Sequence, residues 1–240
     1  MSVLSLKNLV KIYNGKRVVN SVSLSVESGG VVGLLGPNGA GKTTTFYMTI
    51  GMIKSDKGQV FLDDEDITNC PMYLRARKGV GYLPQEASIF RKLTTKQNIM
   101  AILEILPISR SEREERANML LKELGIKNLA DRKASVLSGG ERRRLEISRA
   151  LATNPSFILL DEPFAGIDPL AVIDIKNIIK QLKNHGIGIL ISDHNVRETL
   201  EVCNKAYILS DGKVVEAGSP EKIATSETAR RIYLGDEFRL

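Results

Sequence analysis

One stretch of the sequence constrains the fold more than any other: Gly36-Pro37-Asn38-Gly39-Ala40-Gly41-Lys42-Thr43-Thr44. It follows the apolar run 31–35, so the pattern G-x-x-x-x-G-K-T stands between a predicted strand and a predicted helix, as in phosphate-binding loops. The glycines let backbone N–H groups converge, and the helix start adds a positive dipole end. We expect Lys42 to reach the β- and γ-phosphates of a nucleotide and the Thr43 hydroxyl to bind Mg²⁺. Chance occurrence of the pattern is on the order of one per cent, which argues against a mere connecting turn.

Length and composition are compatible with one α/β domain built around this loop. The chain has 240 residues, of which 42% are apolar, enough for a sizeable core with an inserted lobe. No apolar run approaches the roughly 18 residues that span a bilayer, and the first six residues alternate like a strand. We therefore expect a cytosolic chain, unless a partner holds it at a membrane. The net charge of +6 is compatible with binding to nucleic acid, to an anionic membrane surface or to an acidic protein partner, and it does not distinguish among these three.

The segments around the loop are predicted to be mainly β-structure. Residues 4–13 and 18–26 alternate between apolar and polar and flank Asn14-Gly15, which predicts a hairpin with a type I′ turn. Tyr13 ends the first strand, where its ring could stack on a nucleobase or be an ordinary strand-edge aromatic. Residues 58–63 predict a strand, 75–78 a basic connector and 80–83 a short strand. Pro84 makes Gln85 the first residue of a loop.

Residues 94–152 have a helical pattern and predict an inserted helical subdomain. Ala117, Leu120, Leu121 and Leu124 follow the spacing of one apolar helix face, and Gly125 is expected to end that helix. Further along, Ser138-Gly139-Gly140-Glu141 precedes another helical segment. Ser138 and Glu141 have the spacing of a capping box, and the same N–H groups could instead form a second anion site. The arginines at 142–144 and 149 could contact nucleic acid, although a solvated or carboxylate-paired face is commoner.

Two later strands end in side chains suited to hydrolysis. Residues 157–160 are uninterruptedly apolar, as in a central parallel strand, and lead into Asp161 and Glu162. Ligands bind at the carboxyl ends of such strands, so Asp161 is expected to hold Mg²⁺ and Glu162 to activate the attacking water. Asp168 caps a predicted helix that runs to about 184, and His185 at its end is assigned no chemistry. The strand 188–192 leads to His194, a candidate γ-phosphate contact.

Taken in order, these features resemble the ATP-binding subunit of ABC transporters over the whole chain. The matching parts are Tyr13 as the adenine-stacking aromatic, 36–44 as the Walker A loop, Gln85 as the Q-loop, 137–141 as the signature, 157–162 as the Walker B strand, Asp168 as the D-loop and His194 as the switch histidine. The signature ends in Glu141 where Gln is usual, and the D-loop region 163–168 reads PFAGID. These departures remove no phosphate-contacting group and suggest a particular subfamily.

The resemblance implies a fold, a reaction and cofactors. The fold is a P-loop NTPase core with an N-terminal antiparallel β subdomain and an inserted helical subdomain, within one domain spanning 1–240. The implied cofactors are ATP and Mg²⁺. The implied catalytic residues are Glu162, His194, Gln85 and Lys42. The metal would be bound by Thr43, Gln85 and Asp161. The nucleotide would be bound by Tyr13, the Walker A loop and the signature residues Ser138, Gly139, Gly140 and Glu141. A two-fold homodimer would join the signature of one chain to the phosphate loop of the other.

Two segments, 81–94 and 233–240, resemble the lipopolysaccharide-export ATPases of Gram-negative bacteria. That resemblance implies a homodimer at the cytoplasmic face of the inner membrane, beneath two permease subunits that dock near Gln85 to Leu93. Ile89 and Phe90 are apolar and stand beside basic Arg91 and Lys92, so we expect them to line a groove for a short helix of the partner, unless Phe90 packs inside the helical subdomain. One alternative is the ATPase of branched-chain amino-acid importers, which shares the phosphate loop. Another is a soluble ABC ATPase acting on nucleic acid. Such proteins usually carry two cassettes, long coiled coils or zinc-binding cysteines, and this sequence shows none of these features. We therefore expect no nucleic-acid partner.

Overall fold

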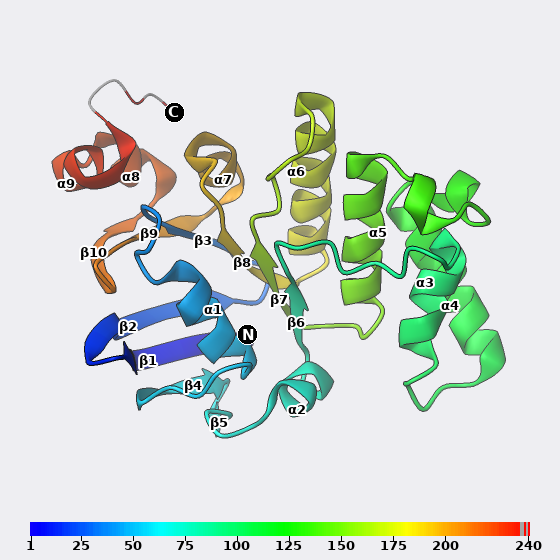
Figure 1. Cartoon of the computed structure of the whole chain (residues 1–240), viewed down its shortest axis with the longest axis horizontal. Helices are drawn as coiled ribbons and strands as arrows, with labels where there is room; N and C mark the ends of the chain where they lie inside the picture. The colour runs from blue at the N-terminus through cyan, green and yellow to red at the C-terminus, as the bar shows by residue number, and fades with distance from the viewer. Residues whose placement is uncertain (236–237, 239) are drawn as a thin grey trace.

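The computed structural model describes residues 1–235, Phe238 and Leu240. Two sheets form its framework (Figure 1). An antiparallel sheet has the order β2-β1-β4-β5, and a larger sheet has the order β10-β9-β3-β8-β7-β6. The strands are β1 (Val3–Tyr13), β2 (Lys16–Glu27), β3 (Val31–Leu35), β4 (Lys57–Leu62), β5 (Glu65–Asp66), β6 (Val80–Leu83), β7 (Phe157–Asp161), β8 (Gly188–Ser192), β9 (Lys205–Ser210) and β10 (Lys213–Gly218).

The helices cover both faces of the larger sheet. They are α1 (Lys42–Ile50), α2 (Met72–Arg77), α3 (Thr95–Leu103), α4 (Arg110–Glu123), α5 (Gly139–Leu151), α6 (Pro169–Asn184), α7 (Val196–Val202), α8 (Pro220–Thr225) and α9 (Glu227–Ala229), with short turns η1 (Lys127–Leu129), η2 (Ala134–Val136) and η3 (Arg230–Leu234). Within the described part of the chain, no helix is long and apolar enough to cross a membrane.

Three apolar cores hold these layers together. One lies between the two sheets and includes Phe46 and Met48 of α1, so that α1 is sandwiched there. A second joins the other face of the larger sheet to α5, α6 and the helices α3 and α4. A third packs the C-terminal helices against the end of β3 and β9. Because the second core is continuous, residues 94–152 pack directly onto the sheet rather than standing apart from it.

The local predictions for turns and helices are largely confirmed. Asn14 and Gly15 have φ values of 49° and 78°, the left-handed pair that a type I′ turn requires. The apolar face predicted around Leu120 is buried, and α4 ends at Glu123, just before Gly125, which has a φ of 66°. Asp168 caps α6 by accepting a hydrogen bond from the backbone N–H of Ala171.

The prediction of a basic connector at 75–78 is wrong, because Arg75 lies inside α2 and is buried. Its guanidinium donates hydrogen bonds to the carbonyls of Met48 and Thr49, at distances of 2.7 and 2.6 Å. These carbonyls stand at the C-terminal end of α1, where helix carbonyls have no partner within the helix. Arg75 therefore caps α1 from a distance, a use of arginine that depends on tertiary structure.

The larger sheet brings three strand ends to one edge. β8 lies between β3 and β7 and is parallel to both, and every residue of the three strands is buried. Their carboxyl ends lead into the glycine-rich loop, into Glu162 and into Asp193-His194, respectively. The fold thus gathers the sequence-predicted groups at the edge where open α/β sheets bind ligands.

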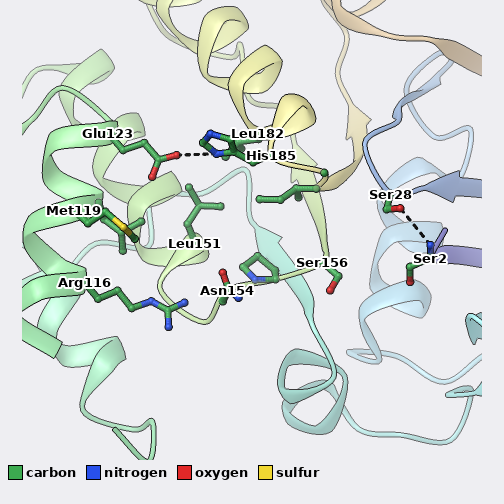
Figure 2. Close-up of a pocket in the computed structure, with 14 residues that line it drawn as sticks. Ser2, Ser28, Arg116, Met119, Glu123, Leu151, Asn154, Ser156, Leu182 and His185 are labelled. Carbon is green, nitrogen blue, oxygen red and sulfur yellow. Dashed lines mark hydrogen bonds and ion pairs between the residues drawn. The ribbon is translucent and has the colours of Figure 1, made fainter. Parts of the chain in front are cut away.

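A separate cavity of about 460 Å³ lies at the opposite end of the same strands (Figure 2). Its lining includes Ser156 and Ile187, which immediately precede β7 and β8, and α4 forms another wall. His185 and Glu123 both line this cavity, and Nδ1 of His185 lies 3.2 Å from a carboxylate oxygen of Glu123, joining the end of α6 to α4. His185 is therefore far from the loop edge, and we assign it only this contact.

Candidate nucleotide site

The glycine-rich loop between β3 and α1 is shaped by close backbone contacts. Gly36, Gly39 and Gly41 have φ values of 146°, 77° and 101°, which L side chains rarely adopt. A Cβ on Gly36 would lie 2.1 Å from the carbonyl oxygen of Leu209, and one on Gly41 would lie 2.5 Å from that of Val18. The two glycines are needed at these positions because neighbouring backbone leaves no room for a side chain.

The loop opens onto a small cavity at the start of α1. The cavity has a volume of about 160 Å³ and is lined by residues 38–44 together with Val18 and Glu162. Gly41 caps α1 without a side chain, so the first N–H groups of that helix are not covered by a capping residue. Thr43 is exposed, with its side chain at the cavity. Backbone N–H groups at a helix start form a favourable environment for a phosphate.

Lys42 is buried at the centre of this loop. Its ammonium donates hydrogen bonds to the carbonyls of Gly36 and Pro37, at 2.6 and 3.0 Å. Burial lowers the pKa of Lys42, while the nearby carboxylates of Glu162, Asp161 and Asp193 favour its charged form. The loop therefore holds a positive charge at its own centre before any ligand arrives.

Asp161, at the end of β7, is the buried carboxyl group of the site. Only 2% of its surface is exposed, and its carboxylate lies 3.4 Å from the Tyr82 hydroxyl. Burial, together with the neighbouring charge of Glu162, raises the pKa of Asp161 to about 6. A buried carboxylate with so little compensation is poised to gain a cation.

Glu162, Gln85 and His194 converge beside the cavity. Nε2 of Gln85 donates to a carboxylate oxygen of Glu162 at 2.7 Å, and Nδ1 of His194 lies 3.4 Å from the same oxygen. Glu162 has a φ of 46°, and its N–H donates to the Ser192 carbonyl at 2.6 Å. A non-glycine residue in this conformation is strained, and such strain often aims a functional side chain.

The signature segment 138–141 lies apart from this cavity. Ser138 caps α5: its Oγ accepts from the N–H of Glu141 at 3.3 Å, and the Glu141 carboxylate accepts from the N–H of Ser138 at 2.8 Å. The predicted capping box is confirmed. Ser138 and Gly139 are exposed, and none of the four residues lines the cavity at the phosphate loop.

Tyr13 also stands outside the cavity lining. It ends β1 with 45% of its surface exposed, and the Lys11 ammonium lies 5.4 Å from its ring centroid. An exposed aromatic ring at this position is compatible with stacking on a flat partner. Its proposed contact with adenine stays a prediction.

Comparison with known proteins decides the family. Residues 19–165 match the family model described as ABC transporter. The chain is 58% identical over 241 residues to the lipopolysaccharide export system ATP-binding protein LptB of Escherichia coli (strain K12), with 100% of both chains covered. This chain belongs to the ABC transporter family. It is an ATP-binding cassette, and as a member of this family it is an ATPase.

Solved structures confirm the predicted fold class of the cassette. The ADP conformation of MJ1267, an ATP-binding cassette of an ABC transporter, matches with a TM-score of 0.88 and 31% identity, over 98% of this chain and 100% of that chain. A dimeric structure of the bacterial cassette MJ0796 matches with a TM-score of 0.80 and 27% identity, over 90% of this chain and 98% of that chain.

The donors at the ATP site of this cassette fit Mg²⁺. Among the described residues, no group of three or more His, Cys, Asp or Glu side chains could hold a metal. Mg²⁺ instead takes one or two carboxylates together with phosphate and water oxygens. The Asp161 carboxylate, the Thr43 hydroxyl and the amide oxygen of Gln85 are hard oxygen donors of that kind, and their joint binding of the ion stays a prediction. The residues present therefore suit the ion that the sequence predicts.

Sequence reasoning missed the role of Arg143 in supporting the cassette's site. Its guanidinium is buried and donates to the carbonyls of Asp161 and Glu162 at 3.1 and 3.2 Å. It also donates to the carbonyl of Pro84 at 3.1 Å and pairs with buried Glu146 at 3.0 Å. Arg143 thus ties α5 to the start of the Q-loop and to the end of β7. The only sequence signal was Glu146 three residues on, which predicts an ion pair but not these carbonyl contacts.

The loop after Gln85 contains two adjacent apolar residues, Ile89 and Phe90, which differ in their exposure to solvent. Ile89 is partly buried and packs against the core that contains α3 to α5, and its place in a docking groove stays a prediction. Phe90 keeps 45% of its surface exposed, and the Arg149 guanidinium lies 4.5 Å from its ring centroid. Arg149 also donates to the carbonyl of Ser88. Arg149 therefore orders the loop and supports an exposed aromatic ring.

The raised pKa of Asp161 predicts a stability effect in metal-free protein. Its folded pKa of about 6 exceeds the ordinary value of 3.8, so the folded state binds more protons between these values. Ionisation of Asp161 therefore lowers the free energy of unfolding. The loss is complete above about pH 6 and disappears below about pH 4. We expect Asp161→Asn to raise the free energy of unfolding by on the order of 2 to 3 kcal/mol at pH 8.

Urea unfolding in EDTA, measured from pH 4 to pH 8, checks this prediction. The gain in the free energy of unfolding should shrink towards zero as the pH falls through 6 to 4. A variant that is less stable than the original chain at pH 8 would contradict the assignment of an uncompensated buried charge.

Proposed function

We propose that this chain is the ATP-hydrolysing subunit of a lipopolysaccharide exporter. The observation that carries the proposal is the full-length 58% identity to a protein named for the lipopolysaccharide export system. That similarity includes the whole of both chains, so it covers the regions that face partners as well as the ATP site. In this role the cassette works at the cytoplasmic face of the inner membrane, attached through two permease subunits, to extract lipopolysaccharide towards the outer membrane.

The active form in this proposal is a two-fold homodimer with ATP between the chains. The signature residues Ser138 and Gly139 are exposed and lie outside the cavity at the phosphate loop, which supports a second chain bringing the two together. The dimeric description of the MJ0796 cassette supports this assembly. Ser138 and Gly140 of one chain would then contact the γ-phosphate bound by Lys42 of the other. Residues 94–152 form the helical subdomain that presents the signature.

The proposed chemistry is attack of water on the γ-phosphorus of ATP. Glu162 accepts a proton from that water, the bond from the γ-phosphorus to the bridging oxygen breaks, and ADP leaves. Lys42 and the loop N–H groups hold the phosphate oxygens, and Gln85 and His194 report whether the γ-phosphate is present. Mg²⁺, held by Thr43, Gln85 and Asp161, would neutralise charge on the phosphates.

We place the membrane partner at residues 85–93, with Phe90 as the anchor. An exposed aromatic ring held by a guanidinium is suited to receive a short helix from another subunit. Phe90→Ala should reduce recovery of the permeases severalfold and lower the free energy of unfolding by only about 1 kcal/mol, since nearly half of the ring is exposed.

Ile89→Ala is the matched control, because Ile89 packs into the helical core. It should lower the free energy of unfolding by about 1 to 3 kcal/mol. Co-purification and thermal unfolding of both variants separate the two effects. If Phe90→Ala lowers stability and leaves assembly intact, Phe90 is a packing residue and the docking proposal is wrong.

Affinity purification of the tagged chain from detergent-solubilised Gram-negative membranes tests the function. We expect lipopolysaccharide-export permeases to co-purify and to stimulate ATP hydrolysis. If amino-acid permeases co-purify instead, the proposed ATPase mechanism stands, but the transported substrate is an amino acid rather than lipopolysaccharide. Recovery of no membrane protein, with salt-sensitive binding of DNA or RNA, would favour a nucleic-acid ATPase.

A further inference from the structure

We propose that the negative charge of the Glu141 carboxylate, which lies in the signature, opposes ATP-driven dimer closure by weakening the attraction between the start of α5 and the triphosphate. This inference rests on the proposed composite ATP site, in which α5 of one chain points its N-terminus at the γ-phosphate bound by the other. In that arrangement Glu141 acts on the nucleotide through its charge, without a direct contact.

The geometry of the α5 cap places the charge beside the phosphate-facing groups. The Glu141 carboxylate accepts from the N–H of Ser138, so it occupies one of the donors at the start of α5. The Ser138 Oγ accepts from the N–H of Glu141, which leaves its hydroxyl hydrogen available for a phosphate. A hydrogen bond from the Ser138 N–H lowers the pKa of Glu141, so the carboxylate is ionised at neutral pH.

The cap itself does not require this charge. α3 of the same chain carries a capping box with glutamine: Oε1 of Gln97 accepts from the N–H of Thr94 at 2.8 Å. The N–H of Gln97 donates back to the Thr94 hydroxyl at 3.1 Å. Glutamine at position 141 would therefore keep the same two hydrogen bonds without a negative charge. The charge adds nothing to the cap geometry that an amide would not provide.

The charge has a direct effect on an anion at the helix start. A helix N-terminus attracts anions because of its positive dipole end, and a fixed carboxylate there offsets that attraction. Arg132 and Arg144 lie near enough to Glu141 to help lower its pKa. Removing the carboxylate would expose a bound phosphate more fully to these two positive charges. Both changes strengthen the attraction for the triphosphate.

The size of the effect follows from Coulomb's law near a surface. Charges several ångströms apart in partly solvated surroundings interact enough to change an equilibrium about three- to tenfold, less at high salt. A two-fold dimer contains the interaction twice, so dimer formation responds more strongly than a single site. We therefore expect Glu141→Gln to lower the ATP concentration for half-maximal dimerisation about three- to tenfold.

The test uses the Glu162→Gln background, in which ATP is consumed slowly. Glu141→Gln is compared with Glu112→Gln, because α4 has the same kind of capping box: Ser109 N–H donates to Glu112 at 2.7 Å. Both substitutions remove one carboxylate from a helix start, but Glu112 does not belong to the signature. Sedimentation measures the dimer fraction against ATP concentration at low and high salt.

The expected result is a lower ATP requirement for Glu141→Gln alone, with the difference shrinking at high salt. If both variants need the same ATP concentration as the Glu162→Gln parent, Glu141 is only a helix cap and this inference is wrong. If the parent itself does not dimerise with ATP, the composite site of the proposed function fails as well. The parent chain thus distinguishes failure of the inference from failure of the proposed function.

Discussion

Glu162→Gln is expected to produce a chain that binds ATP, dimerises and hydrolyses ATP about 10² to 10⁴ times more slowly. Glutamine has nearly the same size and can still accept a hydrogen bond from Gln85, which now donates to Glu162 at 2.7 Å. It cannot take a proton from water. The loss should therefore appear in kcat, because the groups that bind the phosphates are untouched.

Steady-state ATPase assays and ATP-dependent sedimentation measure the two halves of this prediction. Glu112→Gln is the control, since it removes a carboxylate from an exposed helix start and should leave turnover unchanged. Normal turnover in Glu162→Gln would remove Glu162 from its proposed role as the base.

Lys42→Met is expected to lower ATP affinity by roughly tenfold to a hundredfold, and turnover with it. Methionine keeps the buried aliphatic stem and deletes the ammonium that is held by the carbonyls of Gly36 and Pro37. Without that charge, the carboxylates of Asp161, Glu162 and Asp193 face the incoming phosphates uncompensated.

Equilibrium binding of a fluorescent ATP analogue, with thermal unfolding on the same samples, checks Lys42→Met. A folded variant that retains the original affinity for the analogue would show that Lys42 does not contact the phosphates. A variant that has lost its fold would be replaced by Lys42→Arg, which keeps the charge on a bulkier head group.

Local patterns in the sequence were enough to predict most of the fold. The Asn14-Gly15 turn, the apolar face of α4 and the Asp168 cap depend on neighbouring residues alone, so they can be inferred without tertiary structure. The position of Glu162 at a strand end followed from the apolar run before it. The place of His194 at a strand end also made it a candidate phosphate contact, whereas the role of Gln85 beside it was expected only through the resemblance to a family.

Tertiary contacts between distant segments could not be predicted in this way. Arg75 and Arg143 occur in basic runs that resemble solvated surface, yet both are buried and donate to backbone carbonyls far away in sequence. Ile89 and Phe90 are adjacent apolar residues, and only the packing of α3 to α5 decides which one contacts the core. Part of the subfamily resemblance falls on 233–240, of which Asp236, Glu237 and Arg239 lie outside the described residues.

Mixing two inactive variants tests the central claim that each ATP site is shared between two chains. Lys42→Met removes the phosphate-loop charge, and Gly139→Asp adds a carboxylate to the exposed signature, where a Cβ meets nothing closer than 3.8 Å. Each variant alone should be nearly inactive. A mixed dimer regains one intact site, so an equimolar mixture should recover up to about a quarter of the original ATPase activity. If mixing restores no activity while mixed dimers form, the site lies within one chain and the account is wrong.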